Sequence, residues 1–94
     1  MNFTKHVEIG DRSGQCLLTV RDVELHDYLD DLFVQAGLEP LTLRPPDQPA
    51  QLQLLFATGI TKATIHRLLS QVGTDEIERI VRINSGAMGT VGGA

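Results

Sequence analysis

The side chains best suited to chemistry in this chain are its twelve carboxylates, three histidines and single cysteine. Such groups act as acids, bases, nucleophiles or metal ligands when their spacing brings several of them together. His6, His26 and His66 fall in three separate segments, and Cys16 has no second cysteine as a partner. His26 and Asp30 lie four positions apart, but no third metal ligand accompanies them. We therefore expect no catalytic residue, no metal site and no bound cofactor.

Acidic side chains are concentrated in residues 23–36, where apolar residues recur at the spacing of a helix. Asp22 is a suitable N-cap, and Gly37 supplies the left-handed stop. The outer face of this predicted helix carries four acids: Glu24, Asp27, Asp30 and Asp31. This face is the candidate protein-binding surface. It suits a basic partner protein or the basic site of an inhibited target, although a solvated helix face has the same pattern.

A second predicted helix, residues 62–72, carries a small basic face. Thr61 is its N-cap, its apolar residues recur at helical spacing, and Gly73 ends it. Its exposed polar residues are Thr61, Lys62, Thr64, His66 and Arg67.

Residues 58–69, with Gly59 at the turn, resemble the turn and recognition helix of helix-turn-helix repressors of the IclR and LacI types. The resemblance implies that Ile60, Ile65 and Leu68 are buried between two helices. It also implies that residues 50–58 form the supporting helix and that the chain is a DNA-binding transcriptional regulator. It implies further that five polar residues face the bases and phosphates of a DNA major groove. These candidate DNA-binding residues of the alternative function are Thr61, Lys62, Thr64, His66 and Arg67. The resemblance is confined to this part of the chain.

Composition favours a protein partner over a nucleic acid. The chain of 94 residues has the length of one domain, and its formal net charge is −4. An acidic protein lacks the broad attraction to phosphates that most nucleic-acid-binding proteins show. Its apolar runs are too short to span a membrane. A single cysteine suits a reducing compartment, so we expect a cytoplasmic protein that does not contact membranes.

The apolar pattern nearly repeats after 36 positions. Five residues, Gln15, Leu18, Leu32, Gln35 and Gly37, meet identical residues at Gln51, Leu54, Leu68, Gln71 and Gly73. The first copy, about residues 1–37, predicts two strands around a turn followed by a helix. The second copy, about residues 38–73, should therefore have the same ββα order.

Two segments are ambiguous between strand and helix. In residues 50–58 the repeat and the alternation favour a strand, whereas the Ala, Gln and Leu content favours a helix. Residues 76–84 are rich in Ile and Val, which favours a strand. However, Thr74, Asp75 and Glu76 are typical of a helix start. We predict a strand in both segments.

The resulting fold is an α+β, two-layer ββαββαβ sandwich, with a mostly antiparallel sheet and two helices on one face. It forms a single domain over residues 1–84, followed by a flexible glycine-rich tail, residues 85–94. The alternative is a mainly α helix-turn-helix domain with an N-terminal β-hairpin.

The predicted function is that of a small, non-enzymatic regulatory or adaptor protein that binds another protein. DNA-binding regulation remains the alternative. A homodimer would also protect the uncovered sheet face, and residues 40–44 could form a sheet edge that pairs with a second copy.

Overall fold

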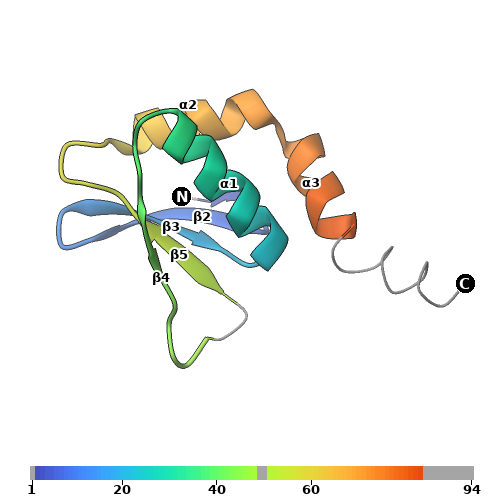
Figure 1. Ribbon diagram of the computed structural model, residues 1–94, viewed down its shortest axis with the longest axis horizontal. Coiled ribbons are helices and arrows are strands. Elements are labelled where there is room, and N and C mark those ends of the chain that lie inside the picture. The colour runs from blue at the N-terminus through green and yellow to red at the C-terminus, as the bar shows by residue number, and fades with distance from the viewer. Residues whose placement is uncertain (1, 49–50, 84–94) are drawn as a thin grey trace, which may run out of the picture.

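The computed structural model describes residues 2–48 and 51–83, which form one antiparallel sheet and three helices (Figure 1). The strands are β1 (Asn2–Thr4), β2 (Val7–Arg12), β3 (Gln15–Val20), β4 (Leu41–Leu43) and β5 (Leu52–Leu55). The helices are α1 (Val23–Gln35), α2 (Lys62–Val72) and α3 (Thr74–Arg82). The strand order is β1-β2-β3-β5-β4. The predicted α+β class with an antiparallel sheet is confirmed.

A tight turn sets the register of the β2–β3 hairpin. Ser13 and Gly14 both have positive φ, at 52° and 84°. Two residues of this kind match the twist of antiparallel strands. Ile9 then lies opposite Leu18, and both are buried. The alternation in the sequence thus becomes one apolar and one polar sheet face.

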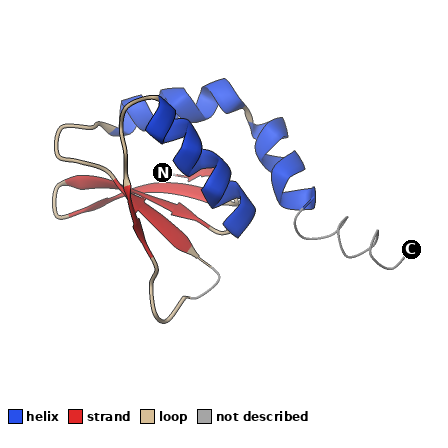
Figure 2. Cartoon of the chain, in the orientation of Figure 1, coloured by secondary structure: helices blue, strands red, loops and turns tan. Residues whose placement is uncertain are grey.

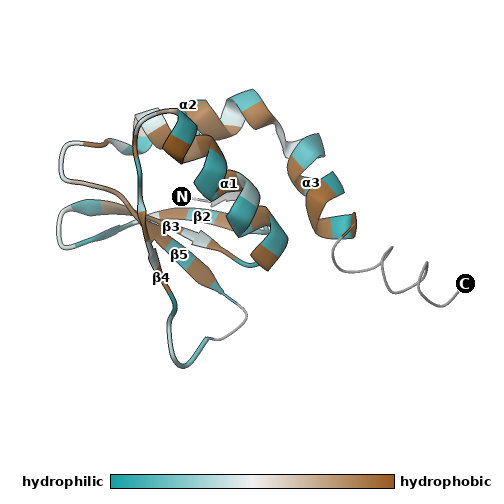
Figure 3. Ribbon diagram, viewed as in Figure 1, coloured by the Kyte–Doolittle hydropathy of each residue, from teal (hydrophilic) through white to brown (hydrophobic). Residues whose placement is uncertain are grey.

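The hydrophobic core lies on one face of the sheet, under α1 and α2 (Figure 2). Hydrophobic and hydrophilic residues alternate along all three described helices, as expected for helices that bury one side (Figure 3). The buried apolar residues of the sheet and its extension are Val7, Ile9, Cys16, Leu18, Val20, Leu52, Leu54 and Phe56. Those of the helices are Leu25, Leu29, Phe33, Ile65, Leu69 and Ile77. The two-layer arrangement with helices on one face is therefore confirmed.

Residues 52–55 form strand β5 and not part of a helix. β5 pairs with β3 on one side and with β4 on the other, so its backbone hydrogen bonds go to the sheet. Leu18 lies directly opposite Leu54, two residues that the internal repeat equates. Pairing and burial thus outweigh the helix propensity of Gln and Leu. Within the described residues 51–58, the supporting helix that the mainly α alternative requires is not formed.

The predicted final strand is wrong, because Thr74–Arg82 form helix α3. Asp75 and Glu76 lie in its first turn, where carboxylates interact favourably with the helix dipole. Ile77 faces the core and is completely buried. The helical spacing of the apolar residues decided the structure, not their β-branched character. Residue 84 of the predicted strand and the predicted tail, residues 85–94, lie outside the described residues.

Gly73 allows α2 and α3 to follow each other almost without a linker. Its φ is 88°, a conformation that L side chains rarely adopt. Its N–H donates to the carbonyl of Leu69 at the end of α2, while its own carbonyl accepts from the N–H of Ile77. One residue therefore ends one helix and begins the next.

Ile77 should be the main anchor of α3. We expect Ile77→Ala to lower the free energy of unfolding by about 2–4 kcal/mol, because the variant leaves a cavity in the core. The matched control is Ile83→Ala at the end of α3, where the isoleucine is 44% exposed. The control should lower the free energy of unfolding by less than about 1 kcal/mol. Urea unfolding followed by circular dichroism measures both, and equal effects would contradict this role of Ile77.

Candidate functional site

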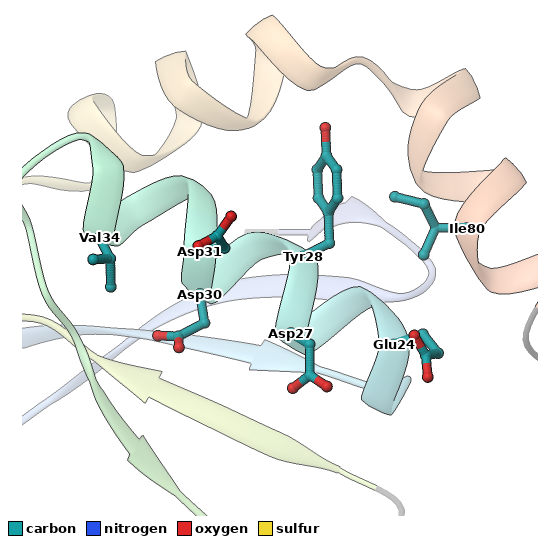
Figure 4. A pocket seen from close by; sticks show the side chains of 7 residues that line it. All are labelled: Glu24, Asp27, Tyr28, Asp30, Asp31, Val34 and Ile80. Atoms are coloured by element: carbon teal, nitrogen blue, oxygen red, sulfur yellow. The ribbon is translucent and has the colours of Figure 1, made fainter.

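The four candidate acids line one hollow beside α1. Their neighbours there are two apolar side chains of the same helix, Tyr28 and Val34, and Ile80 of α3. The hollow measures about 650 Å³ and is open to solvent. We call it the acidic groove; its residues are Glu24, Asp27, Tyr28, Asp30, Asp31, Val34 and Ile80 (Figure 4).

The acidic groove combines apolar surface with carboxylates. Tyr28 and Ile80 project toward the space between α1 and α3, whereas Asp27 and Asp30 project from another side of α1 (Figure 4). Tyr28 is 40% exposed and Val34 is 45% exposed. Exposed aromatic and aliphatic groups bordered by charges are typical of surfaces that bind other proteins.

No described lysine or arginine forms an ion pair with the four acids. Arg79 of α3 interacts electrostatically with Tyr28, but its guanidinium donates two hydrogen bonds to Glu76, of 2.9 and 2.6 Å. This contact raises the pKa of Arg79 and lowers the pKa of Glu76. Arg79 is thus paired with Glu76, and the acidic groove keeps its own negative charge.

His26 is a buried polar group beside the acidic groove, and sequence reasoning did not find its role. Its Nδ1 lies 3.1 Å from Oδ1 of Asp27, and its Nε2 lies 3.3 Å from Oγ1 of Thr42. The ring is only 6% exposed. Asp30 takes no part, so the possible His26–Asp30 ligand pair is not what the structure forms. Among the described side chains, no three potential metal ligands gather.

The order Thr42, His26, Asp27 resembles the nucleophile, base and orienting acid of hydrolases. Catalysis would also require hydrogen-bond donors for an oxyanion and a hollow for the substrate. Neither the acidic groove nor the hollow on α2 is lined by His26 or Thr42. We interpret the three residues as a polar clasp that ties α1 to edge strand β4. Thr42 carries no sequence signal for this role, because the contact depends on how β4 pairs.

Three of the candidate DNA-binding residues, Thr61, Lys62 and Thr64, make contacts within the protein. Oγ1 of Thr61 accepts a hydrogen bond from the N–H of Thr64 and thereby caps the helix. Nζ of Lys62 lies 2.7 Å from Oδ2 of Asp11, and this contact raises the pKa of Lys62. Lys62, His66 and Arg67 do line a solvent-open hollow, together with Ala63 and Ser70. The structure thus gathers the basic groups, although Lys62 is already paired.

Cys16 belongs to the core and is only 6% exposed. Its thiol donates to the carbonyl of Ile60 over 3.1 Å. Burial raises the pKa of the Cys16 thiol, Asp11 acts in the same direction, and Lys62 opposes them. The group is therefore a neutral thiol at pH 7 and a poor nucleophile.

Comparison of the chain with protein-family models, with curated proteins and with solved structures found no match. Within residues 2–48 and 51–83, no helix has both the length and the apolar character needed to cross a membrane.

The clasp predicts a large stability loss at His26. We expect His26→Ala to lower the free energy of unfolding by about 2–3 kcal/mol, mainly because the buried ring leaves a cavity, while water replaces the ring as the partner of exposed Asp27 and Thr42. The matched control is His66→Ala on the exposed face of α2. We expect this control to change the free energy of unfolding by about 0.5 kcal/mol or less. Urea titrations compare the two variants. A His26→Ala protein as stable as the control would refute the clasp.

Cys16 should react slowly with thiol reagents in the folded protein. Its raised pKa means that, at any pH near neutrality, its thiolate fraction is below that of a free cysteine. We expect Ellman's reagent to label it at least about tenfold more slowly at pH 7 than after denaturation in urea. The control is Ser70→Cys in a Cys16→Ala background, which places the thiol on an exposed residue of α2. Equal rates for Cys16 and the control thiol would contradict the prediction.

Proposed function

We propose that this chain is a small, non-enzymatic regulatory or adaptor protein whose acidic groove binds a basic, amphipathic segment of a partner protein. One observation carries the proposal. Four carboxylates without a lysine or arginine partner among the described residues line the same hollow as exposed Tyr28 and Val34 and half-buried Ile80. A segment with both cationic and apolar side chains complements both parts of this surface.

The two kinds of residue would contribute differently to binding. Carboxylates at the rim attract a basic segment and speed its association, an effect that salt weakens. Tyr28 offers a ring face to a lysine or an arginine and an edge to apolar groups. Buried aromatic anchors of this type supply most of the affinity at protein interfaces. Tyr28 is therefore the residue on which we expect affinity to depend most.

The same groove serves two kinds of regulator. The basic segment can be a docking motif of an adaptor's partner, or it can border the active site of an inhibited target. Both require a cationic surface opposite the four acids, so the chemistry of recognition is shared. We place the protein in the cytoplasm, because its single cysteine is used as a core residue and suits a reducing compartment.

DNA binding has less support in this structure. Strand β5 precedes the turn at Gly59 where a helix-turn-helix unit would need a helix. Of the five candidate residues, Thr61 caps α2 by accepting from the N–H of Thr64, and Lys62 is paired with Asp11. DNA binding is therefore kept as an outcome that the following experiment detects.

The proposal predicts a site-specific effect of charge reversal. The probe is a synthetic helical peptide with lysines on one face and leucines on the other, with affinity measured by isothermal titration calorimetry. We expect Glu24→Lys combined with Asp31→Lys to weaken binding at least about tenfold, because like charges then oppose each other. Both acids are exposed, so the variant should fold.

The matched control combines Asp47→Lys with Asp75→Lys, two exposed acids outside the acidic groove. It changes the net charge by the same amount and should weaken peptide binding less than about threefold. Equal loss in both variants would show attraction to the whole acidic protein and refute the groove. Binding of duplex DNA that weakens steeply with salt, and that Arg67→Ala abolishes, would favour the alternative function.

A further inference from the structure

The sheet has a second face, opposite the core, on which no described helix lies (Figure 2). Direct partners in an antiparallel sheet share a face. The register therefore places Gly10, Leu17, Leu55 and Leu41 in one row across four strands, and Glu8, Thr19, Gln53 and Leu43 in the next row. We call these two rows the open sheet face.

The first row forms an exposed apolar stripe. Leu41 is 61% exposed, the largest exposed fraction among the large hydrophobic residues of the described chain. Leu17 and Leu55 are half-buried beside it, and Leu43 follows in the next row. Leucines aligned in register across neighbouring strands form a continuous surface, unlike scattered hydrophobic residues on an ordinary surface.

Polar groups of the open sheet face bond to one another or to a neighbour. Nε2 of Gln53 donates to Oγ1 of Thr19 over 3.4 Å. Nη2 of Arg21 donates to Oε1 of Glu8 over 2.9 Å. Gln53 and Thr19 therefore keep a partner when this face is covered, whereas the exposed Glu8–Arg21 pair has to stay at the solvated rim, because burying an ion pair costs desolvation.

We propose that a second copy of this chain covers the open sheet face, so that two sheets pack face to face in a homodimer. Each copy carries a net charge of −4, so two copies repel each other least where a neutral surface meets its copy or where unlike charges face each other. The open sheet face is such a surface, whereas the acidic groove is not. A neutral leucine stripe also suits its own copy better than it suits a charged partner.

The dimensions are sufficient for a modest interface. β2 and β3 have six residues each, β5 has four and β4 has three. At about 3.3 Å per residue and about 4.8 Å between strands, the face measures on the order of 300 Å² before side-chain relief is counted. Two such faces bury on the order of 600 Å² of flat area, which is the size of a weak, transient contact. The dimer should therefore be weak and depend strongly on concentration, with dissociation in the high micromolar range or above.

Pairing through the edge of β4 is the less favourable way to join two copies. β4 is indeed an edge strand, but it has only three residues. Pro40 precedes it and Pro45 follows soon after it, and neither residue has an N–H to donate. Few hydrogen bonds would form along this edge, whereas face-to-face packing covers the whole leucine stripe.

Face-to-face packing leaves α1 of each copy on the outer side of the dimer. If the proposed function holds, the dimer presents two acidic grooves and can bind two basic segments at once, which raises apparent affinity. Dimerisation itself does not depend on that function. The two proposals can therefore fail separately.

Sedimentation velocity over a dilution series tests the dimer. We expect the wild-type chain to pass from dimer to monomer on dilution, and Leu41→Lys to raise the dissociation constant at least about tenfold. The matched control is Ile83→Lys, which places the same charge on another exposed hydrophobic residue. Ile83→Lys should change the dissociation constant of the dimer by less than about twofold. Methyl NMR signals of Leu17, Leu41 and Leu55 should shift on dilution, a readout that needs no variant.

Three outcomes would overturn the proposal. The first is a wild-type chain that stays monomeric at millimolar concentration. The second is a dimer that Leu41→Lys does not weaken, or whose methyl shifts lie elsewhere. The third is a dimer that salt dissociates, because that result indicates pairing of the acidic groove with the basic hollow on α2. Loss of peptide binding by the groove variants, with the dimer intact, would refute only the proposed function.

Discussion

The contact between Phe33 and Phe56 joins α1 to the segment that follows β5, and the rest of the fold depends on it. The rings meet edge to face, with centroids 4.9 Å apart and planes at 87°. Both side chains are completely buried, so the contact determines which face of the sheet α1 covers. A chain of this size can build one hydrophobic core but not a second. One sheet face is therefore filled, and the other remains open.

Polar contacts then fix the elements at the margins of this core. The His26 clasp holds edge strand β4 to α1, and Lys62 of α2 pairs with Asp11 of β2. Nε2 of His6 lies 3.2 Å from Oε1 of Glu78 and holds α3 near the β1–β2 turn. These contacts matter for function because α3 supplies Ile80 to the acidic groove. The site depends on the docking of a short helix that has Ile77 as its buried anchor.

Much of the fold could be predicted because the residues that form it act locally. Alternation defined β2 and β3, and Asp22 and Thr61 cap α1 and α2 as expected. The internal repeat gave the correct answer for β5 because its leucines alternate toward the same core. The strand prediction fails at α3 because the helical spacing of its apolar residues and the acids of its first turn outweigh the strand propensity of isoleucine and valine.

In the candidate site, too, residues of one helix could be predicted from the sequence, whereas contacts between different elements could not. The four acids were found because they share one helix face, and the structure places all of them at one hollow. Ile80 could not be added while residues 76–84 were expected to form a strand. Thr42 could not be paired with His26, since that contact requires the register between β4 and β5. Sequence patterns identify a face of one element, whereas contacts between elements require the fold.

The way the reactive side chains are used explains why two surfaces remain for function. His26 is held in the clasp, Cys16 fills the core as a neutral thiol, and Lys62 is paired with Asp11. Within the described chain, no buried side-chain nitrogen or oxygen lacks a hydrogen-bond partner. A polar group that already has a hydrogen-bond partner within the protein gains little free energy when it binds a ligand. The acids of the groove have no lysine or arginine partner among the described residues, although Asp27 contacts His26 and Asp31 accepts from Gln35. The leucines of the open sheet face are exposed or half-buried. Cationic and apolar groups of a partner can therefore gain free energy at these two surfaces. Because these surfaces lie on opposite sides of the core, each can be occupied without displacing the other.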